Sequence, residues 1–564
     1  MINFYDFEVF KYDWLVVIMN PAERSKTVIV NNPKQLEQYY NDHKNEIFAG
    51  YNVRHYDQYI FKGILCGFDP KKINDYIIVK NKQGWQFSSM FKKIKLIQYD
   101  VMTKRDRGLK QLEGFMGNNI KETSIPFNIE RRLTENEIAE TIKYCEHDVE
   151  QTMMVFAEEK EEFESHMGLI KTFGLPLDDL GKSKAQLAAK ILDAHMKIHN
   201  DEFDFKIPDC LKIERYKFIL DWYKNPENFD YEKSLEVDVA GVPHVFAWGG
   251  LHGARKNYAS KGIFLNVDVQ SYYPSMMIHF GYTSRNLTQA KKYEEIYHRR
   301  LEYKKNKDPR QAPLKIVLNS SYGAMKDKFN PMFDPMMANS VCVSGMLLLL
   351  DLIEKLMDHC EIIQSNTDGV LLKLKSIDDY DLIDDICWEW EERTGMRLDF
   401  DLFENGMVIQ KDVNNYIISD GKDSYKSKGA YVKKLNNLDN DLPIVNKALI
   451  DFYLYNIPVE RTINNCNDLK YFQKIVKVSS KYMCALHGLR KLNEQTLRVF
   501  ASRDPRDNGV FKLKREGMNP EKFALTPEHC FIENGDVNHM KIPEKLDRQW
   551  YIDLANQRLK DFGV

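Results

Sequence analysis

In the segment "GIFLNVDV", residues 262 to 269, an apolar stretch runs directly into a carboxylate, and this combination limits the folds that the chain can adopt. The segment reads as a buried strand that ends at Asp268, followed by the aromatic-rich "QSYYPSMM". A charge at the mouth of a buried sheet is costly unless something positive lies beside it. The fold must therefore supply a cation or a cationic surface at this strand end.

A second acid takes a similar place further along the chain. The segment "EIIQSNTDGVLLKL" predicts two apolar strands joined by a hairpin at "NTDG", with Asp368 at or beside its tip. An Asp-Gly turn is the cheapest explanation of this residue. Together with Asp268, however, a second strand-end acid is what a site for two metal ions requires.

Two predicted helices with cationic stripes lie between these acids. The segment "YEEIYHRRLEYKKNKDPRQAPLKIVLNSSYGAM" is broken at Asp308-Pro309, where a helix cannot continue. Solvated basic faces are common, but the second stripe is unusual because it sits among apolar residues. The stripes consist of Arg300, Lys304 and Lys307 on the first helix and of Lys315, Asn319 and Tyr322 on the second.

The N-terminal segment "INFYDFEVF" alternates, so that Asp6 and Glu8 share one face of a strand with Ile2 and Phe4. Neighbouring carboxylates repel each other, and a divalent cation between them makes that cost tolerable. The alternative is an edge strand whose acids are solvated.

Two further segments of this lobe carry acids. "FAGYNVRHYDQYIFKGIL" predicts a strand, a turn and a helix, with Asp57 in or near the first helical turn. Acids are common at this position because they stabilise the start of a helix, which is the alternative to a functional role. "LTENEIAETIKYCEHDVEQTMMVF" begins with a capping box, Thr134 to Glu137, and continues as a helix with Tyr144 and Asp148 on one face. A buried hydrogen bond between these two side chains is the alternative to a functional role.

Taken in order, D-x-E, N-x3-Y-D and Y-x3-D resemble the three exonuclease motifs of proofreading DNA polymerases. The resemblance implies a ribonuclease H-like domain that cleaves phosphodiesters with two metal ions. Lys110 would assist the scissile phosphate, although a solvated lysine is the simpler expectation. The implied roles are metal ligation by Asp6, Glu8, Asp57 and Asp148, orientation of the attacking water by Tyr144, and contact with a frayed 3′ end by Asn52 and Tyr56.

Further along, D-x-x-S-Y-Y-P-S, K-x3-N-S-x-Y-G and T-D-G resemble motifs A, B and C of family B DNA polymerases. In that family the acids of motifs A and C bind two Mg²⁺ ions, with Mn²⁺ as a substitute. The implied metal ligands are Asp268, Val269 and Asp368, with Lys315 as a further catalytic residue. The implied nucleotide-binding residues are Ser271, Tyr272, Tyr273, Arg300, Lys304, Lys315, Asn319 and Tyr322.

Two of these tyrosines have distinct implied roles. Tyr273 would press on the sugar and reject a 2′-hydroxyl, and Tyr322 would pack under the base pair. Tyr272 points away from Tyr273 if this segment is extended.

The chain departs from the family pattern at three places. Asn366 stands where motif C usually has its first Asp, so we expect activity to survive with altered metal affinity. In "VFAWGGLHGARK" Ala247 replaces a tyrosine of the template-binding segment, while Gly249 and Gly250 still permit close approach to a phosphate. In the primer-binding segment Asn414 replaces a lysine, and the DNA-binding residues carried over are Tyr416 and Lys428, with Lys426 as a further compensating cation.

The resemblance covers nearly the whole chain and predicts an α/β and α+β multidomain protein, with an exonuclease domain and a right-hand polymerase. The predicted parts are an exonuclease domain (1–170), a helical connecting region (171–235), a palm (236–285 and 326–430), fingers (286–325) and a thumb (431–564). The short intervals between motifs A, B and C leave little room for the two insertions of protein-primed members. We therefore expect a nucleic-acid-primed enzyme, compact like viral or plasmid-borne polymerases.

Composition adds little to this interpretation. Lys plus Arg (80) and Asp plus Glu (83) nearly balance, so any basic surface is local. The nine cysteines never form C-x-x-C, which argues against disulfides and zinc. No N-terminal signal and no run of about 18 apolar residues is apparent, which predicts a cytoplasmic protein, in the host cytoplasm if viral, without membrane contact.

The expected partners are primer-template DNA and dNTPs, with a helicase, a primase or a single-strand binding protein as candidate accessory factors. The competing hypothesis is a 3′–5′ repair nuclease, or a DNA-binding protein with an inactive polymerase lobe. Asn366 favours that alternative, whereas the basic helix pair has no role in hydrolysis.

Overall fold

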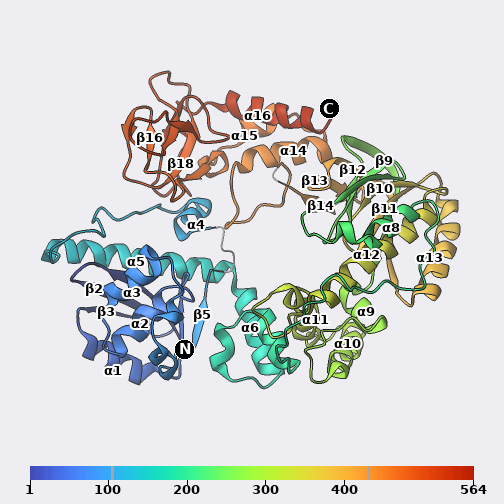
Figure 1. Cartoon of the computed structure of the whole chain (residues 1–564). Helices are drawn as coiled ribbons and strands as arrows, with labels where there is room; N and C mark the ends of the chain where they lie inside the picture. Colours follow the sequence, from blue (N-terminus) through green and yellow to red (C-terminus); the bar gives the residue numbers. More distant parts are fainter. Residues whose placement is uncertain (103–106, 423, 430, 564) are drawn as a thin grey trace. The chain divides into compact units, whose positions relative to one another are not determined.

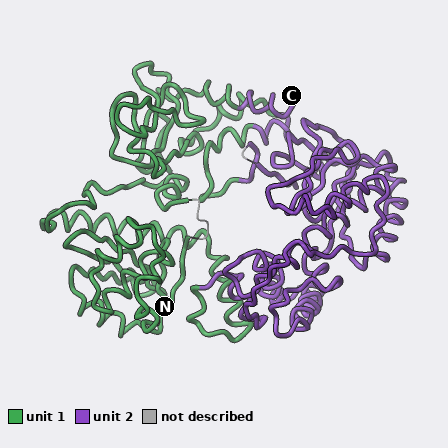
Figure 2. Tube along the Cα trace, in the orientation of Figure 1, with its two compact units in different colours: residues 1–181, 435–448, 457–554 green, residues 182–434, 449–456, 555–564 purple. Residues whose placement is uncertain are grey.

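The computed structural model describes residues 1–102, 107–422, 424–429 and 431–563. Positions 430 and 564, the predicted ends of the palm and the thumb, lie outside that part of the chain. The chain divides into two compact units, shown in two colours in Figure 2. Unit 1 comprises residues 1–181, 435–448 and 457–554, and unit 2 comprises residues 182–434, 449–456 and 555–564. The finer division into exonuclease domain, palm, fingers and thumb stays a prediction.

Unit 1 begins with a mixed five-stranded sheet of order β3-β2-β1-β4-β5. Its strands are β1 (Ile2–Val9), β2 (Trp14–Asn20), β3 (Ser25–Val30), β4 (Ile47–Gly50) and β5 (Gln98–Asp100). β1 lies between antiparallel β2 and parallel β4 and is therefore not an edge strand. As the alternation predicts, Phe4 enters the core on one face of the sheet and Tyr5 and Phe7 enter the core on the other.

Helices cover both faces of this sheet. α1 (Pro33–His43) and α2 (Asp57–Leu65) contribute to the core on the Tyr5 face, and α5 (Glu135–Glu158) contributes to the core on the Phe4 face. The predicted capping box of α5 is confirmed, because Thr134 accepts from the Glu137 backbone N–H and Glu137 accepts from that of Thr134. The other helices of the first 181 residues are α3 (Pro70–Asn74), α4 (Leu109–Met116) and α6 (Lys160–Thr172).

Helix α4 is embedded in the C-terminal part of unit 1. The guanidinium of Arg498, a fully buried residue, donates to the carbonyl oxygens of Gly114 and Asn118 at 3.3 and 2.6 Å, and also to that of Gly535. There is no room for a side chain at position 114, where a Cβ would lie 2.8 Å from Ile475 Cδ1. Segments far apart in the sequence thus fix one helix within this unit.

Two small sheets form most of that C-terminal part. Their orders are β15-β18-β21 and β17-β16-β19-β20. The strands are β15 (Lys474–Lys477), β16 (Cys484–His487), β17 (Arg490–Lys491), β18 (Thr496–Ala501), β19 (Val510–Leu513), β20 (Glu521–Lys522) and β21 (Cys530–Ile532). Helix α15 (Val459–Asn465) lies within this part, whereas α14 (Pro443–Tyr455) and α16 (Arg548–Asp561) begin in unit 1 and end in unit 2.

Unit 2 is built on a nine-stranded sheet of order β14-β13-β12-β9-β11-β10-β8-β7-β6, in which every neighbouring pair is antiparallel. The strands are β6 (Leu235–Val239), β7 (Val242–Phe246), β8 (His252–Ala254), β9 (Tyr258–Val269), β10 (Glu361–Ser365), β11 (Gly369–Leu374), β12 (Leu398–Asp412), β13 (Asn415–Ser419) and β14 (Tyr425–Lys428). The predicted hairpin is confirmed as β10 and β11 (Figure 1).

The helices of unit 2 agree with the sequence in one respect and differ in another. α10 (Ala290–Lys305) and α11 (Gln311–Lys326) confirm the predicted break, although Lys307 lies beyond the end of α10. The segment after Asp268 is not extended: Ser271 has a φ of +52° and α9 (Tyr272–His279) follows at once. The remaining helices are α7 (Lys184–Ile191), α8 (Lys217–Lys224), α12 (Pro335–Leu356) and α13 (Tyr380–Thr394).

Helix α12 is strongly apolar, but polar residues such as Asn339 and Ser340 interrupt it, so it contains no unbroken run of about 18 apolar residues. Within the described part of the chain it is the one helix long and apolar enough to cross a membrane, with a mean hydropathy of 1.8 over its best window. That window is wholly buried inside the protein, which is the environment of a core helix.

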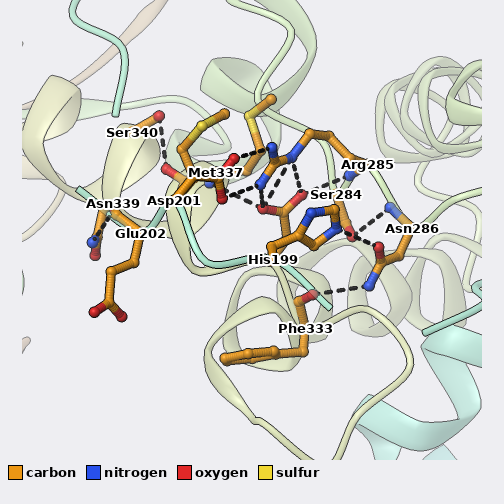
Figure 3. A network of polar contacts seen from close by, with 12 residues as sticks. His199, Asp201, Glu202, Ser284, Arg285, Asn286, Phe333, Met337, Asn339 and Ser340 are labelled. Atoms are coloured by element: carbon orange, nitrogen blue, oxygen red, sulfur yellow. Dashed lines mark hydrogen bonds and ion pairs between the residues drawn. The ribbon is translucent and has the colours of Figure 1, made fainter. Parts of the chain in front are cut away.

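A polar network anchors the N-terminus of α12. Asp334 caps this helix by accepting from the Met337 backbone N–H, and its side chain is 0% exposed. Arg285 forms ion pairs with Asp334 and Asp201 at 2.7 and 2.6 Å, and Figure 3 shows its side chain beside Asp201. Asn286 donates to the Phe333 carbonyl at 2.9 Å. The loop before α10 is thereby tied to the start of α12.

Candidate active sites

The first candidate site lies in unit 1, where the structure brings together the four acids predicted from the first three motifs. Asp6 and Glu8 come from β1, Asp57 is the first residue of α2, and Asp148 lies in α5. The Asp57 carboxylate accepts from the Phe7 backbone N–H at 3.2 Å, which ties α2 to β1. Glu8 is only 6% exposed, so the alternative of solvated acids does not hold for it.

The electrostatics of this cluster favour a cation. Burial first, and then repulsion from neighbouring carboxylates, raises the pKa of Asp6 and that of Glu8 well above their usual values. Burial raises the pKa of Asp57 to about 7 and, against the opposing charge of Lys110, that of Asp148 to about 6. Clustered carboxylate oxygens are the donors that Mg²⁺ and Mn²⁺ prefer, so the residues fit a divalent cation.

Cys145 adds a thiol to this cluster. Its Sγ lies with carboxylate oxygens of Asp6 and Glu8 in a group whose ligand atoms are all within 4.8 Å of one another. The thiol donates to the Asp6 carbonyl oxygen at 3.3 Å. Burial and the neighbouring charges raise its pKa, which keeps it protonated and a poor metal ligand.

Lys110 lies inside the acid cluster, and the expectation of a solvated lysine is wrong. Its ammonium contacts Asp148 and donates to Glu113 Oε1 at 3.0 Å, and it lies 4.7 Å from the centroid of the Tyr144 ring. Burial lowers the pKa of Lys110, but the two carboxylates outweigh that effect and raise it overall. The lysine is therefore charged.

Sequence motifs missed Glu113 and His147. Glu113 is 0% exposed, and His147 Nε2 lies 3.5 Å from its Oε2. One signal could have found Glu113: it follows Lys110 by three residues, so both side chains share one face of a helix. An acid within the otherwise apolar "LEGFM" is the other sign of a buried partner.

The remaining predicted residues of this lobe lie beside the acids. Tyr144 precedes Asp148 by one helical turn, and burial and the charge of Asp148 raise its pKa. Asn52 has a φ of +62°, and its backbone N–H donates to Asp100 at 2.9 Å. The Tyr56 hydroxyl donates to Asn74 at 2.7 Å.

The second candidate site lies in unit 2, at the ends of two neighbouring strands. Asp268 faces Gly369 across the β9–β11 ladder, and the Val269 backbone N–H donates to the Asp368 carbonyl oxygen at 2.7 Å. Burial and then the charge of Asp368 raise the pKa of Asp268. The two predicted strand-end acids are thus neighbours. Val269 has a buried side chain and offers only its backbone to the site.

The hairpin tip explains one of the carried-over glycines. A Cβ at Gly250 would lie 2.7 Å from Thr367 Oγ1, so a larger residue here would require the Thr367 side chain to move. The Gly249 carbonyl oxygen accepts from the Cys342 thiol at 2.5 Å. Asn366 is held by Gln364, whose Nε2 donates to Asn366 Oδ1 at 3.1 Å.

Beside the acids, two tyrosines from different helices stack on each other. The rings of Tyr273 and Tyr322 have centroids 4.0 Å apart and an interplanar angle of 16°. Tyr272 is buried instead against α12, where a Cβ at Gly345 would lie 2.0 Å from its hydroxyl oxygen. Tyr273 and Tyr272 therefore have different surroundings, although the segment is helical.

The predicted polar residues divide into one buried and several exposed members. Arg300 is buried and donates to Ser271 Oγ at 2.7 Å, which holds the turn after Asp268. Lys304, Lys315 and Asn319 are exposed on α10 and α11. On the neighbouring strands Tyr416 and Lys428 pair across the β13–β14 ladder, and burial, with a further contribution from the charge of Asp268, raises the pKa of Tyr416.

Comparison with known proteins gives no match in sequence and a distant likeness in structure. No protein-family model and no curated protein matches the chain in sequence. Among solved structures, it resembles a family B DNA polymerase from the hyperthermophilic archaeon Pyrobaculum calidifontis, with 14% identity and a TM-score of 0.42. The match covers 100% of this chain and 77% of that one. At this level of similarity, function has to be argued from the residues of this chain.

Proposed function

We propose that this protein is a template-directed DNA polymerase that extends a primer 3′ end with dNTPs and also removes nucleotides from 3′ ends. The observation that carries the proposal is the pairing of Asp268 with Asp368 at adjacent strand ends, beside the stacked Tyr273 and Tyr322. It lies within a set of motifs that occur in the order of family B polymerases.

For extension, Asp268, Asp368 and the Val269 carbonyl would hold two divalent cations. Bound there, the cations would lower the pKa of the primer 3′-hydroxyl and neutralise the triphosphate. The exposed Lys315 and Lys304 attract the triphosphate as cations. The buried Arg300 fixes the turn that carries Ser271 and so positions the neighbouring Tyr273.

The stacked rings of Tyr273 and Tyr322 would line the pocket for the incoming nucleotide. Tyr322 presents a ring against which a base pair can pack. Tyr273, held against it at 4.0 Å, fills the volume that a 2′-hydroxyl would need. We infer that deoxynucleotides are selected by this steric exclusion. Primer-template DNA and dNTPs are then the substrates.

For degradation, Asp6, Glu8, Asp57 and Asp148 would hold the divalent cations, and Tyr144 would orient the attacking water. Lys110 supplies a positive charge beside them. Asn52 and Tyr56 lie on the segment between β4 and α2 and would contact the single-stranded end, where aromatic stacking tolerates any base. The acids of the two reactions belong to different compact units, so each reaction has its own metal ligands.

One specific observation favours a second candidate function. Asn366 carries no charge, as expected if the polymerase lobe were inactive and the protein were a repair nuclease. Extension of a labelled primer on a template, with each dNTP and Mg²⁺ or Mn²⁺, decides between the two. Template-directed addition supports the polymerase, and degradation without any addition supports the nuclease.

A further inference from the structure

Glu113 is held in a single position beside the acid cluster of unit 1. Its Oε1 accepts from Lys110 Nζ at 3.0 Å. Its Oε2 accepts from the Lys121 backbone N–H at 3.3 Å and lies 3.5 Å from His147 Nε2. A fully buried carboxylate is costly unless its charge is compensated, and Lys110 is the charged partner that compensates it.

Lys110 is shared between two carboxylates with different duties. Its ammonium contacts both Asp148 and Glu113. Once Asp148 serves as a metal ligand, its oxygens are less free to accept from the ammonium, and the like charge of the ligated cation repels it. Glu113 lies near Asp148 in a group of possible metal ligands with His147, but its Oε1 already accepts from the Lys110 ammonium at 3.0 Å, so we assign it to the lysine and not to a metal.

We propose that Glu113 is the positioning residue that retains the Lys110 ammonium beside Asp148 and Tyr144 while Asp148 acts as a ligand. The ammonium then stays where it faces the phosphate being cleaved. This inference rests on the proposed degradation of 3′ ends.

Helix α4, which carries both residues, is held firmly enough for this task. Arg498 binds the carbonyl oxygens of Gly114 and Asn118 at its C-terminal end. Gly114 itself packs so closely against Ile475 that a Cβ would lie 2.8 Å away. The helix therefore cannot slide along its axis and move Lys110 away from Asp148. The distance between Lys110 and Glu113 is set by their spacing of three residues on the helix.

The proposal predicts opposite effects of the two partners on metal affinity. Glu113→Gln keeps the shape of the side chain but removes a negative charge and leaves Lys110 to Asp148 alone, so Mn²⁺ binds more weakly. Lys110→Met removes the competing positive charge, so Mn²⁺ binds more tightly. Both substitutions slow degradation, because both remove the ammonium from its working position.

The test uses the full-length chain carrying Asp368→Asn, which weakens the metal site of unit 2. Mn²⁺ binding is followed by electron paramagnetic resonance, and degradation of a labelled single strand is followed under single-turnover conditions. The proteins compared are the parent, Glu113→Gln, Glu113→Asp, Lys110→Met and the double variant Lys110→Met with Glu113→Gln. Glu150→Gln is the matched control, since it removes the same charge from an exposed position two residues after Asp148.

We expect Glu113→Gln to slow degradation about 10- to 100-fold with little change in DNA affinity. Glu113→Asp, which keeps the charge, retains more of the rate, and Glu150→Gln behaves like the parent. The double variant should match Lys110→Met, because Glu113 acts through the lysine. Thermal unfolding confirms that each variant is folded. If Glu113→Gln is not, Glu113→Asp replaces it in the rate comparison and should slow degradation in the parent but not in the Lys110→Met background.

The inference is overturned if Glu113→Gln slows degradation further in the Lys110→Met background, or if the two single variants shift Mn²⁺ affinity in the same direction. A parent protein that binds Mn²⁺ but degrades no single strand refutes the proposed function instead. Even then, the opposite shifts in Mn²⁺ affinity decide whether Glu113 and Lys110 are coupled.

Discussion

Gly369 determines whether the two strand-end acids of unit 2 can lie side by side, and Gly369→Ala tests this. A Cβ at this position would lie 1.9 Å from Asp268 Oδ1 and 2.8 Å from the Val267 carbonyl oxygen. The carboxylate can rotate away, but the backbone oxygen belongs to the β9–β11 ladder and cannot. The substitution therefore displaces the Asp268 carboxylate and strains the ladder together.

The magnitudes follow from this geometry. Overpacking of a well-packed site costs about 1–3 kcal/mol of stability. A displacement of a catalytic group by about 1 Å costs roughly 100-fold in rate. We therefore expect a modest loss of thermal stability and a loss of about 100-fold in the rate of nucleotide addition, while degradation of single strands stays unchanged.

The assay pairs thermal unfolding with single-nucleotide addition at saturating dNTP. The stability control is Gly323→Ala in α11, where a Cβ meets no atom within 4 Å. That variant should be as stable as the parent or more stable by up to ~1 kcal/mol. Wild-type addition by a folded Gly369→Ala protein would refute the placement of Asp268 beside the hairpin.

Three further predictions concern unit 2. Tyr273→Val removes the ring stacked on Tyr322 and should raise ribonucleotide incorporation by orders of magnitude, consistent with a discrimination of about 3–5 kcal/mol. Tyr272→Val should leave this discrimination unchanged. Single-nucleotide kinetics with dNTP and rNTP on both variants check this, and unchanged discrimination by Tyr273→Val contradicts it. Burial lowers the pKa of His244 to about 4, so the stability that the neutral side chain contributes is complete above its unfolded pKa of about 6.5 and is lost as the pH falls through 4. Between pH 7 and 4 the free energy of unfolding should therefore fall by about 3 kcal/mol more in the wild type than in His244→Gln. Parallel pH profiles of the two proteins would count against this. Arg285→Met leaves the fully buried Asp334 without its ion pair and should cost about 3–5 kcal/mol in chemical denaturation, a value near zero being the contrary result.

Local signals in the sequence predict much of the framework. The alternation of "INFYDFEVF" sends Phe4 and Tyr5 to opposite cores, and the capping box fixes the start of α5. The hairpin at "NTDG" and the break at Asp308-Pro309 are also found. Each of these features depends on residues close together in the chain, so short-range patterns suffice to predict it.

What the sequence did not show depends on contacts across long separations. From the sequence alone, Lys110 resembles a surface lysine. It is buried because α4 packs beside α5, and Arg498, far along the chain, helps to hold α4 by its hydrogen bonds to the end of that helix. The buried Glu113 was missed for the same reason. The left-handed Ser271 was missed because Arg300, on another helix, helps to hold that turn. Helix α12 was missed because its apolar stretch is interrupted by polar residues that are themselves buried.

The proposal that two separate sites add and remove nucleotides is tested most directly by one comparison on a single labelled primer-template. Extension and 3′ degradation are measured for the wild type, for Asp268→Asn and for the pair Asp6→Ala with Glu8→Ala, each shown to be folded by thermal unfolding. We predict that Asp268→Asn loses extension by about 10³-fold or more and keeps degradation, and that the N-terminal pair shows the reverse. Loss of both activities in a folded Asp268→Asn protein, or extension at the wild-type rate, would contradict the account.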